Sequence, residues 1–384
     1  MLVTMRVTVA LVSGERVELS ENAKDTSVAQ LRRAAQAAFR RRGTLDKITG
    51  IAWLISSRGV KLSSASSLKE AGVQEDEVLT GILRRDDLIF HESTCSILRG
   101  DGSLFTVGDG SPTKEPGDWE EHVAKPEYLE DVRQIGASEA AFAALLEDGS
   151  VVTWGDGRYG ADSKAVRRKL NGIRRVIASN YAFAAVCEDR TVVAWGDPAF
   201  GGDASPLQSR LRGVEDIKAT SCAFAAVLED SSVMAWGHPN GGSNTLALRR
   251  LRLRVQQIEA TSGAFAALLE DGSVLAWGDP DQGGDCRAVR KKLVNVRELR
   301  ANSGAFAALR RDGCVVAWGD HFTGGDPSRV MDELRGVKQI LAGRYSFGAL
   351  LPDGRRIVWP SPSLAADRAE LEIQSIKRSP GDSF

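Results

Sequence analysis

The stretch that decides the fold is Ala264-Phe265-Ala266-Ala267-Leu268-Leu269-Glu270-Asp271-Gly272-Ser273-Val274-Leu275-Ala276-Trp277. Two apolar runs flank Asp271-Gly272, a dipeptide that favours a tight type I′ hairpin turn because it accepts positive φ angles. The runs are apolar at successive positions, whereas a strand with one face in water would alternate with polar residues. The stretch therefore predicts a β-hairpin covered on both faces.

This hairpin is one copy of a repeat. Asp-Gly also stands at the turn of three other copies, at 148–149, 312–313 and 353–354. Two further copies have Asp189-Arg190 and Asp230-Ser231 at the same position of the repeat, which are weaker turn signals. A seventh hairpin, Cys95 to Val107, precedes the others, with Asp101-Gly102 at its turn. The tryptophan that ends the hairpin recurs every 41 residues, at Trp154, Trp195, Trp236, Trp277, Trp318 and Trp359. A fixed period of this length is the signature of a repeat architecture.

A half-motif alternates with the hairpins, an apolar residue followed by another three positions later. The series begins with a hairpin and ends with a partial half-motif at Ile373/Ile376. An open solenoid needs polar capping repeats at its ends. Here the two ends are complementary halves of one repeat, so we predict a ring in which residues 370–376 pair with the first hairpin and cover its edge strand. We therefore predict a mainly β fold, a seven-bladed β-propeller over residues 88–376. The six full half-motifs are Val132/Ile135, Ile173/Val176, Val214/Ile217, Val255/Ile258, Val296/Leu299 and Val337/Ile340.

The side chains that recur with the repeat are interpreted as parts of the scaffold. The tryptophans are predicted to pack between blades and to bind no ligand. The recurring aspartates are predicted to accept backbone N–H groups in turns; a ring of cation sites is the alternative. These aspartates are Asp109, Asp156, Asp197, Asp279 and Asp320 after the tryptophan or Val107, and Asp162, Asp203, Asp285 and Asp326 further on.

The first 84 residues have a different pattern. Two short alternating strands flank Ser13-Gly14, and Thr26 or Ser27 can cap a helix from about residue 28 to 40. Its predicted apolar stripe is Leu31, Ala34, Ala35 and Ala38. Apolar strands at 52–55 and 77–83 complete a small α+β domain. We place it at 1–84, a linker and the start of the propeller at 85–94, and a tail at 377–384.

Two resemblances follow from these motifs. Ala-Phe-Ala-Ala-Leu, Asp-Gly, Val-x-x-Trp-Gly-Asp and Gly-Gly-Asp resemble the regulator-of-chromosome-condensation repeats and their compact versions in HERC-type ubiquitin ligases and a bacterial β-lactamase inhibitor protein. The sequence departs from that pattern where phenylalanine, as at Phe265, replaces a frequent histidine. Residues 1–84 resemble a ubiquitin-like β-grasp domain and end at Leu83-Arg84-Arg85-Asp86 without the diglycine of conjugation. The resemblance implies a built-in recognition domain.

Composition and motifs bear on the class of function. With 50 basic and 51 acidic residues the net charge is −1, so no nucleic-acid partner is expected. No apolar run is long enough for a membrane span, and the five separated cysteines suit reduced thiols. We expect a monomer in the cytoplasm or nucleus. The four histidines have no zinc-ligand spacing, and no phosphate-binding or nucleophile motif occurs. We expect no enzyme activity, cofactor or metal. In HERC-type ligases the catalytic cysteine lies in a domain C-terminal to the propeller, so the propeller resemblance does not imply ligase activity.

Partners are expected at positions that vary within an otherwise repeated loop. After Trp-Gly-Asp these positions should lie around one rim of the propeller, where Tyr, Phe and Arg are suited to anchor an interface; folding back onto the same blade is the alternative. The link from Val107 to Val132 is longer than the others, and Trp119, Glu120 and Glu121 in it form a predicted partner-binding loop. The rim residues are Arg158, Tyr159, Phe200, Asn240, Gln282 and Phe322.

Four functions remain open on the sequence alone. The leading hypothesis is a scaffold whose propeller binds a protein target and whose ubiquitin-like domain docks on ubiquitin-pathway machinery. The first alternative is a guanine-nucleotide exchange factor for a small GTPase, with the long loop as its wedge. The second is a component related to HERC-type ligases without the catalytic domain. An inhibitor that plugs an enzyme's active site is a further possibility that the N-terminal domain disfavours.

Overall fold

The computed structural model describes residues 4–22, 25–45, 49–63, 66–85, 87–91, 94–98, 104–107, 129, 131–244 and 254–360. The chain divides into two compact units, Met1–Ala137 with Ala143–Trp154, and Ser138–Phe142 with Gly155–Phe384. Among the described residues, no helix has the length and apolar character needed to cross a membrane.

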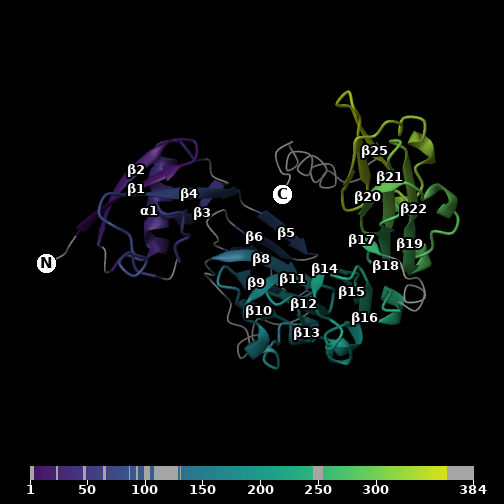
Figure 1. Ribbon diagram of the computed structural model, residues 1–384, viewed down its shortest axis with the longest axis horizontal. Helices are drawn as coiled ribbons and strands as arrows, with labels where there is room; N and C mark the ends of the chain where they lie inside the picture. The colour runs from purple at the N-terminus through teal and green to yellow at the C-terminus, as the bar shows by residue number, and fades with distance from the viewer. Residues whose placement is uncertain are drawn as a thin grey trace. The chain divides into compact units, whose positions relative to one another are not determined.

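The N-terminal sheet contains β1 (Thr4–Leu11), β2 (Arg16–Asn22), β3 (Thr49–Ile55) and β4 (Glu77–Arg85). Its order is β2-β1-β4-β3, and β1 and β4 are parallel while the outer pairs are antiparallel. The strands and helix follow the predicted order, whereas the predicted domain boundary at residue 84 stays a prediction, since the compact unit that contains them extends beyond it. Figure 1 shows these elements with their labels.

The one helix described beside this sheet, α1 (Val28–Arg41), begins at the expected residue. Ser27 caps it in a capping box with Gln30. The predicted stripe is only partly right: Leu31 and Ala35 are buried, but the stripe missed Phe39, which is fully buried. Arg32 is also buried; it donates to the Ala52 carbonyl (2.6 Å) and pairs with Asp131 (3.1 Å). A long cation on the inner face was not foreseen because the expected stripe counted apolar residues.

The rest of the described chain forms seven three-stranded antiparallel sheets. In six of them the half-motif is the first strand and the hairpin supplies the second and third; in the first sheet residues 87–91 take the place of the half-motif. The arrangement is consistent with the predicted seven-bladed propeller. The sheets are β5 (Asp87–His91), β6 (Thr94–Leu98), β7 (Leu104–Val107); β8 (Val132–Ala137), β9 (Ala141–Leu146), β10 (Val151–Gly155); β11 (Ile173–Ala178), β12 (Ala182–Cys187), β13 (Val192–Gly196); β14 (Val214–Ala219), β15 (Ala223–Leu228), β16 (Val233–Gly237); β17 (Val255–Ala260), β18 (Ala264–Leu269), β19 (Val274–Gly278); β20 (Val296–Ala301), β21 (Ala305–Arg310), β22 (Val315–Gly319); and β23 (Gln339–Ala342), β24 (Phe347–Leu350), β25 (Arg356–Trp359).

The first repeat sheet corrects one prediction. Its hairpin was expected to pair with residues 370–376, but β5 pairs with β6 in the place of the first strand. The reason is local: Leu88-Ile89-Phe90 is a strand-forming run only a few residues from β6, and a short loop costs little closure entropy. Residues 370–376, and with them the predicted ring closure, lie outside the described residues.

The hairpin turns differ from the expected type I′. In the turn at Asp148-Gly149 only Gly149 has a positive φ (80°), and in the turn at Asp189-Arg190 only Arg190 has one (61°). The Gly149 N–H donates to Leu146 O (3.0 Å) and the Leu146 N–H to Ser150 O (2.9 Å). This is a tight turn followed by one left-handed residue, and type I′ needs two such residues. The hairpins are confirmed and the turn type is wrong.

Candidate functional site

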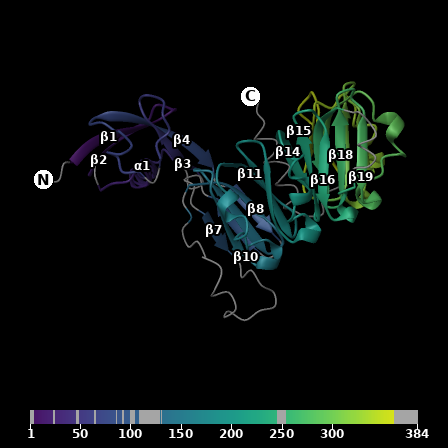
Figure 2. The same cartoon turned by 60° about the horizontal axis from the view of Figure 1, so that its bottom comes forward.

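Within the described residues, a 3₁₀ turn follows the third strand in five repeats, and these five turns lie in the second unit. Because the strands are antiparallel, the loop between the first and second strands lies at the same end of the sheet as this 3₁₀ turn. We call the surface formed by these loops and 3₁₀ turns the turn end; the hairpin turns lie at the opposite end. Figure 2 shows β14, β15 and β16 of one such sheet. The 3₁₀ turns are η1 (Gly157–Tyr159), η3 (Pro198–Phe200), η5 (Pro239–Gly241), η6 (Pro280–Gln282) and η8 (His321–Thr323).

The recurring aspartates cap these turns, as predicted. The carboxylate of Asp156 accepts the N–H of Arg158 (2.9 Å), and Asp320 accepts that of Phe322 (2.9 Å). Further on, Asp203 and Asp285 accept the N–H two residues later in the same way. The pKa of Asp285 falls to about 2, first because the Arg287 side chain donates to the carboxylate. These carboxylates therefore belong to the scaffold; Asp109 lies outside the described residues.

A polar column that sequence reasoning missed holds the turns against the sheets. Thr220 accepts the Ala223 N–H (3.0 Å) and donates to the Gly241 carbonyl in η5 (3.0 Å). Its equivalents in three other repeats bond to the 3₁₀ turn in the same way: Ser138 to Tyr159, Thr261 to Gln282 and Asn302 to Thr323. Ser179 of the preceding repeat accepts the Ala182 N–H within its own loop. The signal was present in the sequence, because each residue directly follows the alanine that ends a half-motif.

The tryptophan column packs from repeat to repeat, as predicted. Trp277 is buried, stacks on Phe265 of its own sheet, and donates from Nε1 to the Gly242 carbonyl of the preceding repeat (2.9 Å). Gly242 has φ of 92°, and a Cβ there would lie 2.8 Å from the Phe265 ring. Trp277, Phe265 and Gly242 thus form one packing unit that belongs to the scaffold.

Backbone bonds also join the turn end from sheet to sheet. The N–H of Asn180 donates to Ser221 O, that of Ser221 to Ser262 O, and that of Ser262 to Ser303 O, at 2.7–2.9 Å. Glu139 and Arg344 extend this series at its two ends. The turn end is therefore a continuous surface with a fixed backbone, on which side chains at the variable positions are displayed.

Four rings form a row across three neighbouring repeats of this surface. Tyr181 stacks on Tyr159 (centroids 5.3 Å) and on Phe200 (4.4 Å), and Phe200 stacks on His238 (5.6 Å). All four are half-buried. Burial, then the carboxylate of Glu139, raises the pKa of Tyr181. Tyr181 and His238 were not among the predicted residues, because the prediction considered only positions after Trp-Gly-Asp; Tyr181 precedes its hairpin, and His238 replaces that aspartate.

The predicted rim residues all lie on the 3₁₀ turns, but they differ in surroundings. Tyr159 and Phe200 stack on rings from neighbouring loops. Arg158 is exposed and forms an ion pair with Asp156 of its own turn (2.6 Å). Phe322 is 75% exposed and contacts the His321 ring. Asn240 is exposed and Gln282 lines a pocket. Trp119, Glu120 and Glu121 lie outside the described residues, so the predicted binding loop stays a prediction.

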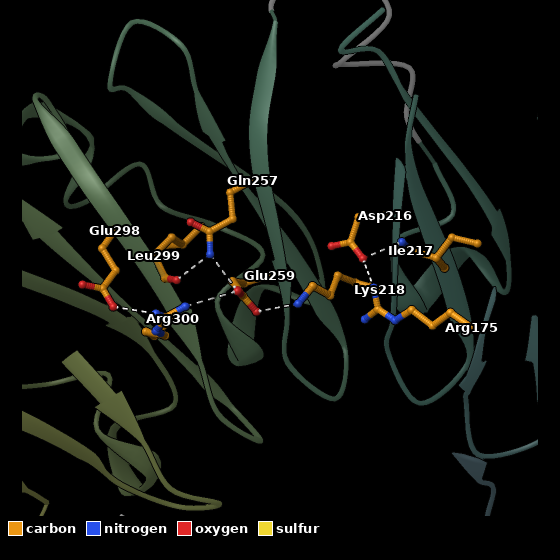
Figure 3. A network of polar contacts seen from close by, with 9 residues as sticks. All are labelled: Arg175, Asp216, Ile217, Lys218, Gln257, Glu259, Glu298, Leu299 and Arg300. Atoms are coloured by element: carbon orange, nitrogen blue, oxygen red, sulfur yellow. Dashed lines mark hydrogen bonds and ion pairs between the residues drawn. The ribbon is translucent and has the colours of Figure 1, made fainter. Parts of the chain in front are cut away.

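The first strands carry a ladder of charges from sheet to sheet (Figure 3). Arg175 of β11 pairs with Asp216 of β14, and Lys218 of β14 pairs with Glu259 of β17 (3.4 Å). Arg300 of β20 lies between Glu259 (3.9 Å) and Glu298 (2.7 Å). Since each charge has an opposite charge beside it and neighbouring first strands are in contact, the ladder is interpreted as scaffold.

A pocket of about 820 Å³ opens between η6 and η8 and is called the η6–η8 pocket. Its wall combines acidic, aromatic and amide side chains from three successive repeats. It contains no lysine or arginine among its lining residues, all of which the structure describes. The wall includes Asp281, Gln282, Trp318, Asp320, His321 and Tyr345.

The four cysteines whose side chains are described form no disulfide with one another; Cys286 is buried and the other three are half-buried. Burial raises the pKa of Cys187, Cys222 and Cys286, which disfavours the reactive thiolate.

No protein-family model matches the chain, and no curated protein matches it. Solved β-propeller structures do match, including the regulator-of-chromosome-condensation protein of yeast. The CRINKLY WD40 ectodomain of the Arabidopsis thaliana receptor kinase ACR4 is 16% identical, with 71% of this chain and 95% of that chain covered and a TM-score of 0.42. Yeast RCC1 (Prp20), solved in complex with Kap60, is 15% identical to this chain. The match covers 61% of this chain and 70% of that chain, with a TM-score of 0.41. Human WBSCR16 is 15% identical, with 68% of this chain and 83% of that chain covered and a TM-score of 0.38.

Proposed function

We propose that this chain is a non-catalytic protein-interaction scaffold whose turn end binds a protein target. The observation that carries the proposal is that recurring and variable side chains at the turn end have different roles. Recurring side chains there, such as Asp320 and Thr261, are used in bonds within the scaffold. Side chains that vary, among them the aromatic row and the exposed Phe322, face outward or form half-buried stacks.

This surface has the properties of an interface that anchors a partner. Aromatic side chains supply large contact areas at low entropic cost, and arginine adds directed hydrogen bonds. The backbone bonds between successive loops fix the relative positions of the rings before binding, which lowers the cost of ordering them in a complex.

The test is site-specific photo-cross-linking in the full chain. A photoreactive residue at Phe322, at the turn end, should capture one defined partner. The same residue at Arg311, an exposed position in the hairpin turn at the opposite end of the same sheet, should not. Equal capture at both positions, or capture only at Arg311, would contradict the proposal.

We further propose that the N-terminal sheet with α1 is a ubiquitin-like domain that docks on ubiquitin-pathway proteins. The mixed order β2-β1-β4-β3, with parallel β1 and β4 at its centre and a capped helix after the first hairpin, supports the β-grasp assignment. The sheet face opposite α1 supports docking, because Val78, Ile82 and Trp53 lie there and are exposed or half-buried.

Binding of the full chain to a panel of purified ubiquitin-binding domains tests this second part. Val78→Glu, on the free face, should abolish the interaction, whereas Val12→Glu, an 83% exposed position in the first hairpin turn, should not. If no domain binds, and the chain instead accelerates nucleotide release from a small GTPase, the exchange-factor alternative replaces the proposed role.

A further inference from the structure

The η6–η8 pocket has a chemistry that selects one kind of side chain. Asp281 is exposed at its edge, and no ion pair of its carboxylate is seen within the described part of the chain. Asp320 adds a second carboxylate, 34% exposed; its Oδ1 accepts the Phe322 N–H and caps η8, so its Oδ2 is the oxygen that can accept from a ligand. A third, Asp285, is neutralised by its bonds to the Arg287 side chain. The pocket therefore offers two carboxylates and, apart from His321, no cationic group among its lining residues.

An aromatic surface faces the same space. Tyr345 lines the pocket and is 37% exposed, and the guanidinium of Arg344 already lies over its ring, 5.3 Å from the centroid. Trp318 also lines this space, but its ring is buried and its Nε1 donates to the Gly283 carbonyl, so it belongs to the scaffold and not to the receiving surface. Planar guanidinium groups stack on aromatic faces and bond carboxylates with two parallel N–H groups, and a lysine ammonium does neither as well.

We propose that the η6–η8 pocket receives an arginine side chain from a basic segment of the protein partner. The guanidinium stacks on Tyr345 and donates to Asp281 and Asp320, while Gln282 is within the same wall to accept from the adjacent peptide. The inference rests on the proposed function and specifies its partner: a protein with an exposed arginine. The Arg344 guanidinium occupies one face of the ring and competes with the incoming one.

The experiment uses the full chain and a fluorescein-labelled Gly-Ser-Arg-Ser-Gly peptide, with binding followed by anisotropy. The same peptide with citrulline in place of arginine keeps the shape and removes the charge. We expect the citrulline peptide to bind at least about fivefold more weakly, and Asp281→Asn and Tyr345→Ala to lower affinity for the arginine peptide by about threefold to fivefold each.

Asp332 and Arg335 provide matched controls. They form an exposed pair outside the pocket, so Asp332→Asn should leave arginine-peptide binding unchanged. Arg344→Ala should raise affinity about twofold to threefold because it removes the guanidinium that competes for the Tyr345 ring, whereas Arg335→Ala should not. Equal binding of both peptides, or equal effects of Asp281→Asn and Asp332→Asn, would overturn the inference.

Failure of this inference can be separated from failure of the proposed function. If Phe322 captures a partner in the cross-linking experiment but the arginine peptide does not bind, the turn end is an interface and the arginine assignment of the pocket is wrong. If neither is observed, both proposals are wrong.

Discussion

The N-terminal sheet and the repeat sheets bury their strands in different ways. In β1 burial alternates, with Val7 and Val9 packed in the core with α1 and Arg6 exposed between buried neighbours. In β15 every residue from Ala223 to Leu228 is buried. One face of β15 packs against the sheet before it, and the other face packs against the sheet after it. A repeat sheet such as this one has no free face, so only its ends and turns can meet a partner, whereas the N-terminal sheet keeps one face open.

Tryptophan substitutions should show the largest difference between the two regions. Trp277→Ala removes a buried ring and its bond to the preceding repeat, and should cost about 3–5 kcal/mol of unfolding free energy. Trp53→Ala, on the open face of the N-terminal sheet, should cost about 1 kcal/mol. Urea denaturation followed by circular dichroism measures both. Similar losses would mean that Trp277 is not an inter-repeat contact.

Glycine substitutions should sharpen the comparison with a smaller effect. At Gly283 (φ 90°) a Cβ would lie 2.6 Å from the Phe306 ring, so Gly283→Ala adds a clash to a strained backbone. Its expected cost is about 2–3 kcal/mol. Gly14 in the first hairpin has φ of 102°, but a Cβ added there would meet no atom within 4 Å, so Gly14→Ala should cost about 1 kcal/mol. Thermal unfolding that shifts equally for both variants would exclude the proposed packing on phenylalanine.

The smallest effect concerns the aspartates of the hairpin turns. The Ser273 hydroxyl and N–H donate to Asp271 and lower the pKa of its carboxyl below 3.8. Because the folded pKa lies below the unfolded one, the stabilisation is present above the unfolded pKa and disappears as the pH falls through the folded pKa. Ser273→Ala should raise the pKa of Asp271 toward its ordinary value. A carboxyl titration by NMR checks this, and an unchanged pKa would show that the hydroxyl is not a donor.

Much of the fold was predictable because it follows from side chains that recur at one spacing. Trp277 and Asp320 stand at positions that recur from copy to copy, so their packing and capping roles could be stated from the sequence. The first strand of the first repeat sheet was assigned to 370–376 because Leu88-Ile89-Phe90 lacks the spacing of the other half-motifs. Its actual pairing depends on proximity along the chain, which periodicity does not report.

The candidate site was less predictable for the opposite reason. Tyr181 occupies a position that is alanine, cysteine or glycine in four other repeats, and His238 occupies one that is aspartate in five others. Their row exists only because three neighbouring loops bring the rings together. The charge ladder gave a fainter signal: Lys218, Glu259 and Arg300 alternate in sign at the repeat spacing. Recognising the pairs also requires that first strands of successive sheets be in contact, which the sequence does not state.

Hydrogen–deuterium exchange of the full chain with and without the partner captured at Phe322 tests most directly whether the turn end is the binding surface. Binding there should protect segments 156–160, 197–201, 279–283 and 320–324, and should leave exchange unchanged in the hairpin turns at 188–190, 270–272 and 311–313. Protection of those hairpin turns with none at the 3₁₀ turns would contradict a binding surface at the turn end.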